Sequence, residues 1–259
     1  MIQITTPISV IERALRYVTG TISLGADDVL LASYPRSGNT WVRFFFANLI
    51  NVVEGDESQV THSVVDRMMP ELGVDSLTAA WESNTVPRII KTHAEYSPFF
   101  FRPRKVFLAR DPRDVMVSYY HYLRDRKEVY EGVFSQFLRS GKYGLEAWCR
   151  HYLSWTSVAD HRLSYESMLD DDLGSFSCLV SRLNLSVPSE AVREATERSR
   201  FERLSKLEDG EEEAEPGNDK PQRTFFRSGG KSDWQSYATE RDALYLTNVL
   251  SEYGIPEYT

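Results

Sequence analysis

The chain has only two cysteines and no long apolar run. Both features limit the classes of protein to which it can belong. Its two cysteines, Cys149 and Cys178, form no CxxC pair and no Cys/His pattern with metal-ligand spacing. They predict reduced, buried thiols in a reducing compartment, with a disulfide between them as the alternative. No apolar stretch approaches the roughly 20 residues that cross a bilayer, and the N-terminus lacks the layout of a secretory signal. We therefore expect a cytoplasmic protein without a membrane partner.

Positive charge is also scarce. The 30 Lys and Arg residues face 38 Asp and Glu residues, which gives a formal net charge of −8. General nucleic-acid binding requires a basic face, so this balance disfavours it. Any anion that binds must meet a local cluster of Arg and Lys side chains. The composition, 41% hydrophobic and 26% charged, is otherwise that of a globular protein.

Apolar runs that end in polar residues alternate with helical patterns along the chain. The predicted strands are residues 29–33, 88–91, 105–109 and 161–165, and the predicted helices are residues 112–124, 144–159 and 189–200. Asp111 is placed as the N-cap of one helix, with Pro112 in its first turn. The alternation predicts one α/β domain over residues 1–259, a central parallel sheet flanked by helices. Ligands of such sheets collect at the C-terminal ends of the strands.

Two segments stand outside this alternation. Ile8, Ile11, Leu15 and Val18 recur at helical spacing and predict a short amphipathic helix packed on the body. The alternative for this helix is a place on a membrane surface. Residues 208–222 are acidic, contain two prolines and two glycines, and predict a mobile loop.

The turn after the first strand has the composition of a phosphate cradle. The sequence Tyr-Pro-Arg-Ser-Gly-Asn-Thr lies between a strand and a helical pattern, a layout that aims backbone N–H groups at an anion. Gly38 lets the backbone approach phosphate oxygens, Ser37 and Thr40 add hydroxyl groups, and Arg36 adds a permanent charge. The turn is not a Walker A loop, because Asn39 stands where that loop has lysine. An ordinary strand-to-helix connection is the alternative.

Lys91 and His93 follow the second predicted strand. On an extended backbone, residues two apart point to the same side, so both side chains can face one cleft. A histidine beside a fixed cation can act as general base for a hydroxyl while the cation neutralises developing negative charge. The alternative is a structural histidine.

Two further cationic segments contain residue types that are suited to binding phosphate. Arg110 ends the third predicted strand, and Ser118 lies on the helix that follows. Arg110 could bind a phosphate through its forked donors; the alternative is an ion pair with Asp111 or Asp114. Residues 227–231, Arg-Ser-Gly-Gly-Lys, form a glycine-flanked cationic turn, for which a surface turn is the alternative.

Five blocks in a fixed order carry a family resemblance. They are YPRSGNTW after a strand, IKTH, VFLARDPRDVMVSYYHY, a strand ending in YESM, and FFRSGGKSDW. Together they resemble the sulfotransferase family, in its cytosolic branch and its soluble bacterial relatives, over residues 29–237. The resemblance implies a P-loop-kinase-like fold with a modified phosphate-binding loop and no metal. It also implies 3′-phosphoadenosine 5′-phosphosulfate (PAPS) as donor, adenosine 3′,5′-bisphosphate (PAP) as product, and a small-molecule acceptor with a hydroxyl or an amine.

The resemblance also implies roles for single residues. In catalysis, His93 would take the proton of the acceptor, while Lys91 and Arg36, which replaces the family's usual lysine, would neutralise the transferring group. The residues that it assigns to the donor are Arg36, Ser37, Gly38, Asn39, Thr40, Trp41, Arg110, Ser118, Tyr165, Ser199, Phe201, Arg227, Ser228 and Gly229. Of these, Trp41 and Tyr165 would lie at the adenine.

The last motif departs from the family pattern. It reads Arg227-Ser228-Gly229 where the family usually has Arg-Lys-Gly, so one cation is missing and Lys231 is its candidate substitute. The family's short C-terminal dimer motif is not recognisable after Trp234, which leaves the oligomeric state open. Two other functions remain as alternatives: a P-loop nucleotide kinase-like phosphotransferase, and a nucleotide-binding relative without catalysis.

Overall fold

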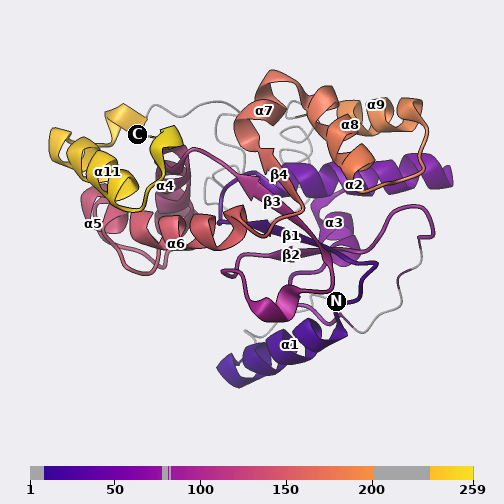
Figure 1. Cartoon of the computed structure of the whole chain (residues 1–259), viewed down its shortest axis with the longest axis horizontal. Helices are drawn as coiled ribbons and strands as arrows, with labels where there is room; N and C mark the ends of the chain where they lie inside the picture. Colours follow the sequence, from indigo (N-terminus) through magenta and orange to yellow (C-terminus); the bar gives the residue numbers. More distant parts are fainter. Residues whose placement is uncertain (1–8, 78–80, 82, 201–233, 259) are drawn as a thin grey trace, which may run out of the picture.

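The computed structural model describes residues 9–77, 81, 83–200 and 234–258 (Figure 1). Its centre is a four-stranded sheet with the order β2-β1-β3-β4, and every neighbouring pair is parallel. The strands are β1 (Val29–Ser33), β2 (Ile89–Thr92), β3 (Arg104–Ala109) and β4 (His161–Ser164). Helices cover both faces of this sheet, which confirms the predicted fold class.

Alternate residues of the central strands point into two separate cores. Leu30 and Ala32 of β1 belong to one core, and Val29 and Leu31 belong to the other. All five residues of β1 are buried, as expected for a strand covered on both faces. The sheet therefore holds its strand ends between two layers of helices.

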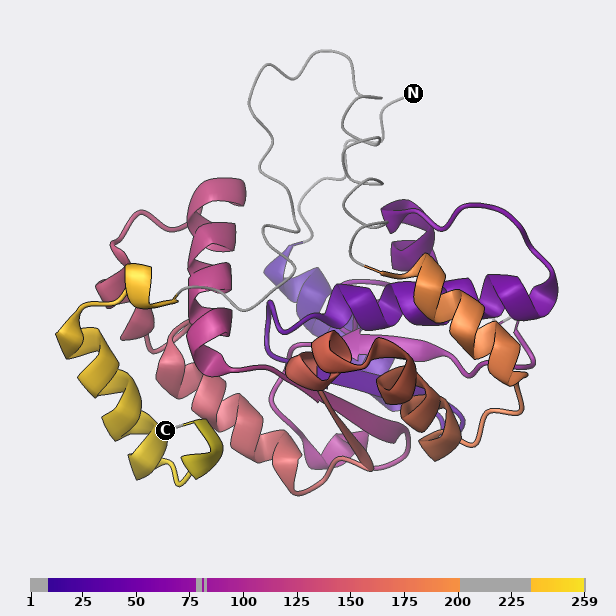
Figure 2. The ribbon, with the colours of Figure 1, turned by 90° about the horizontal axis from the view of Figure 1, so that it is seen from above.

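The helices form two groups on either side of the sheet (Figures 1 and 2). The first group is α2 (Asn39–Glu54), α3 (His62–Met68), α7 (Tyr165–Asp170), α8 (Asp172–Arg182) and α9 (Ser189–Arg198). The second group is α4 (Pro112–His121), α5 (Phe134–Leu138), α6 (Leu145–Thr156) and α11 (Glu240–Glu252). Short turns of helix are η1 (Pro98–Phe100), η2 (Tyr122–Arg126), η3 (Trp234–Ser236) and η4 (Pro256–Tyr258).

Local sequence explains several helix starts. The Asp111 carboxylate accepts a hydrogen bond from the backbone N–H of Arg113, and Pro112 occupies the first helical position of α4, as predicted. Helix α4 ends at His121, three residues before the predicted end, because the chain continues as the π-helical turn η2. Tyr165, predicted to end a strand, instead begins α7, whose N-cap is the Ser164 hydroxyl.

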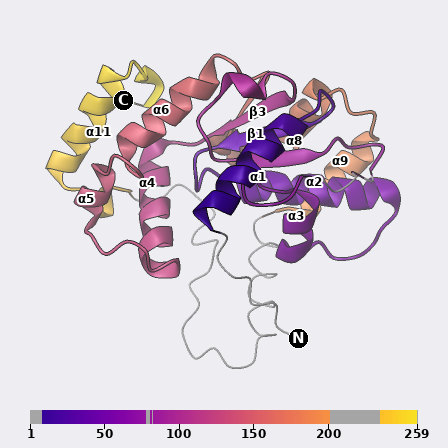
Figure 3. The same ribbon diagram turned by 90° about the horizontal axis from the view of Figure 1, so that it is seen from below.

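Helix α1 (Val10–Ser23) corrects one sequence prediction. It lies outside the sheet, against residues 72–77 and η1 (Figure 3). Its apolar residues Ile11, Leu15 and Val18 are 74%, 61% and 54% exposed, so these three members of the predicted stripe do not pack on the body. The fourth member, Ile8, lies outside the described residues. None of the described helices combines the length and apolarity needed to cross a bilayer.

The thiols correct a second prediction. Both cysteines are free, but only Cys149 is buried, while Cys178 is exposed on α8. Periodicity within one helix does not tell which of its faces meets a neighbour, and Cys178 lies on the outer face.

Candidate active site

The connection between β1 and α2 has the geometry of an anion-binding turn. The Ser37 N–H donates to the Tyr34 carbonyl at 3.3 Å, and the Trp41 N–H donates to the Gly38 carbonyl at 3.0 Å. Arg36 and Gly38 both adopt positive φ, 71° and 98°. Gly38 is the N-cap of α2 without a side-chain cap, so the first N–H groups of a 16-residue helix face this turn.

Two buried polar atoms in the turn have no hydrogen-bond partner among the described residues. They are the hydroxyl of Ser37 and the side-chain oxygen of Asn39. The Ser37 side chain is almost completely inaccessible, so leaving its hydroxyl unpaired costs free energy. A bound phosphate or sulfonate oxygen would supply the missing partner for that hydroxyl. The residues of this turn therefore fit an anion, and that they hold the donor stays a prediction.

Arg36, Ser118 and Arg110 come together beside the turn. The Arg36 Nε donates to the Ser118 hydroxyl at 3.1 Å, and the Arg36 guanidinium lies 5.0 Å from the centre of the Tyr122 ring. The Arg110 Nη1 donates to the Arg36 carbonyl at 3.2 Å. The connections that follow β1 and β3 thus place two guanidinium groups at one edge of the sheet, beside Ser118 of α4, where the sequence expected them.

Arg110 is buried and makes two further contacts. Its guanidinium lies 4.1 Å from the centre of the Tyr165 ring, and its Nη2 lies 3.8 Å from a carboxylate oxygen of Asp114. The alternative of an ion pair with Asp114 is thus present in this structure. Asp111 instead pairs with Arg113 at 2.6 Å.

Tyr165 and Trp41 form an aromatic wall next to the turn. Their rings meet edge to face with centres 6.0 Å apart, although they come from α7 and α2. A Cβ added to Gly38 would lie 2.5 Å from the Tyr165 ring, so the ring packs directly on that glycine. The buried indole nitrogen of Trp41 has no hydrogen-bond partner in the described structure. The role of both rings at the adenine stays a prediction.

His93 is joined to the turn through Ser33, the last residue of β1. The Nδ1 of His93 lies 2.7 Å from the Ser33 carbonyl oxygen, an arrangement in which Nδ1–H donates. The tautomer with hydrogen on Nδ1 leaves Nε2 as a proton acceptor. The Ser33 hydroxyl in turn accepts from the Asn39 side-chain amide at 3.1 Å. The candidate base and the phosphate turn therefore share one hydrogen-bonded framework.

The surroundings of His93 keep its imidazole neutral. Burial lowers its pKa to about 4, and the nearby ammonium of Lys91 adds to this effect. The carboxylate of Glu71 and the hydrogen bond to Ser33 act in the opposite direction. At neutral pH the ring is therefore unprotonated, the form that a general base needs.

Two residues near His93 belong to none of the sequence motifs, and the sequence did not predict either of them. Glu71 accepts from the Lys91 ammonium at 2.7 Å, across 20 positions of sequence. His151 of α6 is buried against the Tyr34 ring, 5.6 Å between ring centres. Burial lowers the pKa of His151 to about 3, so a second neutral imidazole lies near His93.

Some predicted site residues are not brought to the turn. The Ser199 hydroxyl is buried between α9 and α2, where it donates to the Ala195 carbonyl and accepts from Asn48 at 3.1 Å. Its role at the nucleotide stays a prediction. Phe201, Arg227, Ser228, Gly229 and the acidic segment 208–222 lie outside the described residues, so their roles stay predictions too. The described residues contain no group of three His, Cys, Asp or Glu side chains that could hold a metal ion.

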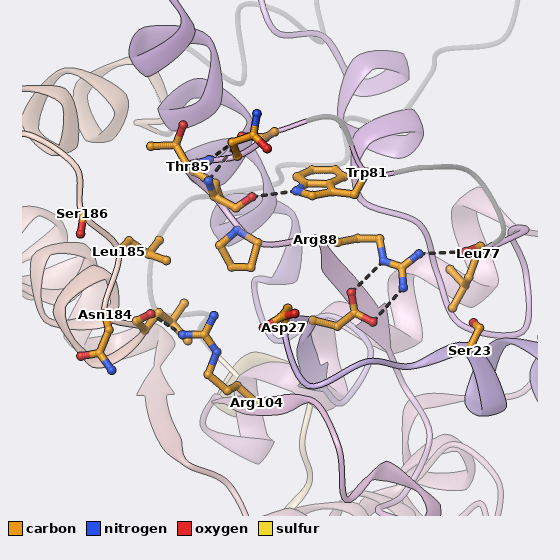
Figure 4. Close-up of a pocket in the computed structure, with 16 residues that line it drawn as sticks. Ser23, Asp27, Leu77, Trp81, Thr85, Arg88, Arg104, Asn184, Leu185 and Ser186 are labelled. Carbon is orange, nitrogen blue, oxygen red and sulfur yellow. Dashed lines mark hydrogen bonds and ion pairs between the residues drawn. The ribbon is translucent and has the colours of Figure 1, made fainter.

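A separate hollow of about 800 Å³ lies at the opposite ends of the strands (Figure 4). Arg88 precedes β2 and pairs with Asp28, which precedes β1, through two hydrogen bonds of 2.9 and 2.8 Å. Trp81 and Arg104 also line it. It is remote from Lys91 and His93, because the N-terminal and C-terminal ends of parallel strands lie at opposite edges of a sheet.

Comparison with solved structures supports the fold. Retinol dehydratase in complex with retinol and PAP superposes with a TM-score of 0.69 at 20% identity, covering 92% of this chain and 85% of that one. Mouse sulfotransferase SULT7A1 complexed with PAP gives a TM-score of 0.67 at 20% identity, with 96% of each chain covered. At these identities the likeness concerns the fold.

Comparison with protein sequences identifies the family. The chain is similar to sulfotransferase 1B1 of Canis lupus familiaris, 26% identical over 235 residues, covering 82% of this chain and 78% of that protein. Sulfotransferase 1A1 of Bos taurus is 27% identical over 235 residues with the same two coverages. The family model described as sulfotransferase domain matches residues 26–253. The resemblance inferred from the motifs is thereby confirmed: this chain belongs to the sulfotransferase family.

Proposed function

We propose that this protein transfers a sulfuryl group from PAPS to a hydroxyl or amine of a small molecule, with His93 as general base. The observation that carries the proposal is the framework from Asn39 through Ser33 to His93, with contacts of 3.1 and 2.7 Å. This framework supports the proposal because it connects a neutral imidazole to the turn that would bind the donor. An in-line transfer to a neutral nucleophile requires a proton acceptor and an anion-binding group held at fixed positions relative to each other, and the Ser33 link would hold them so.

Each part of the site has a distinct task in this proposal. The donor supplies the sulfuryl group and leaves as PAP. The α2 N-terminus and Ser37 bind the 5′ end of the nucleotide, while Arg110 and Ser118 bind its 3′-phosphate. Lys91 neutralises charge on the transferring group, and His93 Nε2 takes the acceptor's proton. Fixed cations and backbone N–H groups supply the electrostatic stabilisation of the transition state.

The first test removes the base. His93→Ala should lower kcat about 10²- to 10⁴-fold, the usual contribution of a general base, and should leave PAP affinity nearly unchanged. Labelled-donor assays with alcohols, phenols, sugars and amines would measure turnover, and calorimetry would measure PAP binding. His161→Ala is the matched control, because His161 begins β4 at the far edge of the sheet. A variant at position 93 with wild-type kcat would exclude His93 as the base.

The second test removes a phosphate contact. Arg110→Ala should weaken PAP binding by about 2–3 kcal/mol, the range for hydrogen bonds to charged groups. Arg113→Ala serves as control, since Arg113 lies three residues further on, in the first turn of α4, and is paired with Asp111. Equal losses in both variants would mean that Arg110 has no specific phosphate contact.

The same calorimetry separates this proposal from a kinase-like function. Magnesium-ATP chemistry of the P-loop type relies on a lysine next to Thr40, where this chain has Asn39. We therefore expect PAP to bind much more tightly than magnesium-ATP. The reverse order of affinity would favour the phosphotransferase.

A further inference from the structure

Glu71 is fixed beside Lys91 by the backbone. Residues 70–72 run parallel to β2: the Lys91 N–H donates to the Pro70 carbonyl at 2.9 Å, and the Leu72 N–H donates to the Lys91 carbonyl at 2.9 Å. The Glu71 N–H donates to the Asp75 carboxylate at 2.7 Å, which anchors the segment from its other side. The position of Glu71 relative to Lys91 is therefore set by main-chain hydrogen bonds.

The side chains of this pair are largely shielded. The Glu71 Oε2 lies 2.7 Å from the Lys91 Nζ, and the two side chains are 25% and 17% exposed. A lysine side chain has four rotatable bonds, and a partner fixed by the backbone removes much of that freedom. The ammonium is thus held at one place beside the candidate base.

The groups around His93 act on its ring in opposite directions. Lys91 and Arg43 disfavour a proton on its ring, while Glu71 and the Ser33 carbonyl favour one. His151, a further titratable neighbour of His93, is neutral because burial lowers its pKa to about 3. Burial opposes the charge of Glu71, but the ammonium of Lys91, through its charge and its hydrogen bond, and Arg13 keep the pKa of Glu71 below its usual value, so the carboxylate stays ionised at neutral pH.

Proton transfer to His93 would place two positive charges close together. When the acceptor oxygen or nitrogen forms its bond to sulfur and the bond from sulfur to the bridging oxygen of PAPS breaks, the acceptor's proton moves to Nε2. An imidazolium then lies beside the Lys91 ammonium. Like charges in a shielded site repel strongly, so a nearby carboxylate lowers the free energy of this state. Among the described groups acting on His93, Glu71 supplies that negative charge.

We propose that Glu71 is a positioning residue for the transfer: it fixes the Lys91 ammonium and offsets its charge, so that His93 can accept the proton. This inference rests on the proposed function for its catalytic meaning. The effect of the Glu71 charge on Lys91 and His93 does not depend on that function, and it can be measured without turnover.

The decisive test is an NMR titration of the His93 ring between pH 8 and 3, with His93→Ala for assignment. In Glu71→Gln the charge is lost at nearly constant volume, and the pKa of His93 should fall below its wild-type value of about 4. Glu71→Asp keeps the charge on a shorter side chain and should return the pKa most of the way. Glu54→Gln, a change at the end of α2, is the control and should leave it unchanged. Equal midpoints in wild type and Glu71→Gln would overturn the proposal.

Kinetic measurements then distinguish a positioning role of Glu71 from a purely structural one. Glu71→Gln should lower kcat about tenfold or more while PAP affinity and Tm stay close to wild type, and Glu71→Asp should recover part of the rate. A parallel loss of PAP affinity and Tm would show a structural role and contradict the proposal. If the wild type transfers no sulfuryl group to any acceptor, the proposed function fails, while the titration still decides whether Glu71 sets the charge at His93.

Discussion

At the scale of single residues, two glycines with positive φ allow two effects to be compared. One is the effect of backbone strain on stability, and the other is the effect of a disturbed donor site on binding. Gly38 and Gly55 lie at the two ends of α2, with φ of 98° and 74°. A Cβ on Gly38 would lie 2.5 Å from the Tyr165 ring, whereas a Cβ on Gly55 would meet nothing within 4 Å. Both positions favour glycine, and only one is also in contact with the proposed donor site.

We therefore expect the two alanine variants to differ in binding. Each should lose about 1 kcal/mol of unfolding free energy to backbone strain, measured by urea denaturation. Gly38→Ala should in addition weaken PAP binding at least tenfold, because Tyr165 must move and the turn is disturbed, while Gly55→Ala should bind normally. Unchanged PAP affinity in Gly38→Ala would argue against this turn as the donor site.

Residues within a motif were predictable, and those outside one were not. Arg36, Ser118 and Arg110 could be expected together, because each follows or faces the end of a strand and the carboxyl ends of parallel strands meet at one edge. Glu71 lies in no predicted strand. Its contact with Lys91 depends on the register of residues 70–72 along β2, which no local pattern in the sequence encodes.

At the scale of elements, α1 shows why a periodic pattern gives a helix but not its orientation. The stripe of Ile11, Leu15 and Val18 is exposed, although such a stripe usually meets the core. The opposite side makes the contacts with the body. There Gly20 is buried, and the Tyr17 ring meets the Phe100 ring with centres 6.3 Å apart. Glycine permits the close approach, and no count of apolar residues reveals it.

Substitutions on the two sides of α1 test this orientation. A Cβ on Gly20 would lie 2.9 Å from Leu72 and 3.2 Å from Leu77, so Gly20→Val should cost roughly 1–3 kcal/mol through overpacking. Leu15→Ser on the exposed side should change stability by about 0.5 kcal/mol or less. Urea denaturation measures both. A cost above about 2 kcal/mol for Leu15→Ser would mean that the stripe is buried.

At the scale of the whole molecule, the fold class was predictable from the alternation of strand and helix patterns along the chain. The order of the strands in the sheet was not. The seven segments predicted as strands or helices all keep their expected type, with boundaries shifted by a few residues. The signal is clearest in β1, where burial on both faces leaves a continuous apolar run. The order β2-β1-β3-β4 depends on which crossover packs on which face. That choice is made by the two cores, whose members come from distant parts of the chain.

The two shielded imidazoles should make the whole fold sensitive to mild acid. Burial lowers the pKa of His93 to about 4 and that of His151 to about 3, against about 6.5 in an unfolded chain. Between these values the unfolded state binds more protons, so the free energy of unfolding is highest above pH 6.5 and falls as pH decreases. Each histidine should cost on the order of 2 kcal/mol between pH 6.5 and 5, where 1 pKa unit is about 1.4 kcal/mol.

His151→Phe isolates one of these contributions. Phenylalanine keeps an aromatic ring beside Tyr34 and Trp155 but cannot bind a proton, so the variant should lose less stability on acidification than the wild type. Urea denaturation at pH 7.5, 6.5, 5.5 and 5 would measure the slope, which does not depend on any constant packing change that the substitution introduces. We expect the slope to fall by roughly half, since His93 still titrates. An unchanged slope would mean that His151 is already protonated or solvated in the folded protein, and that its ring is not shielded from water.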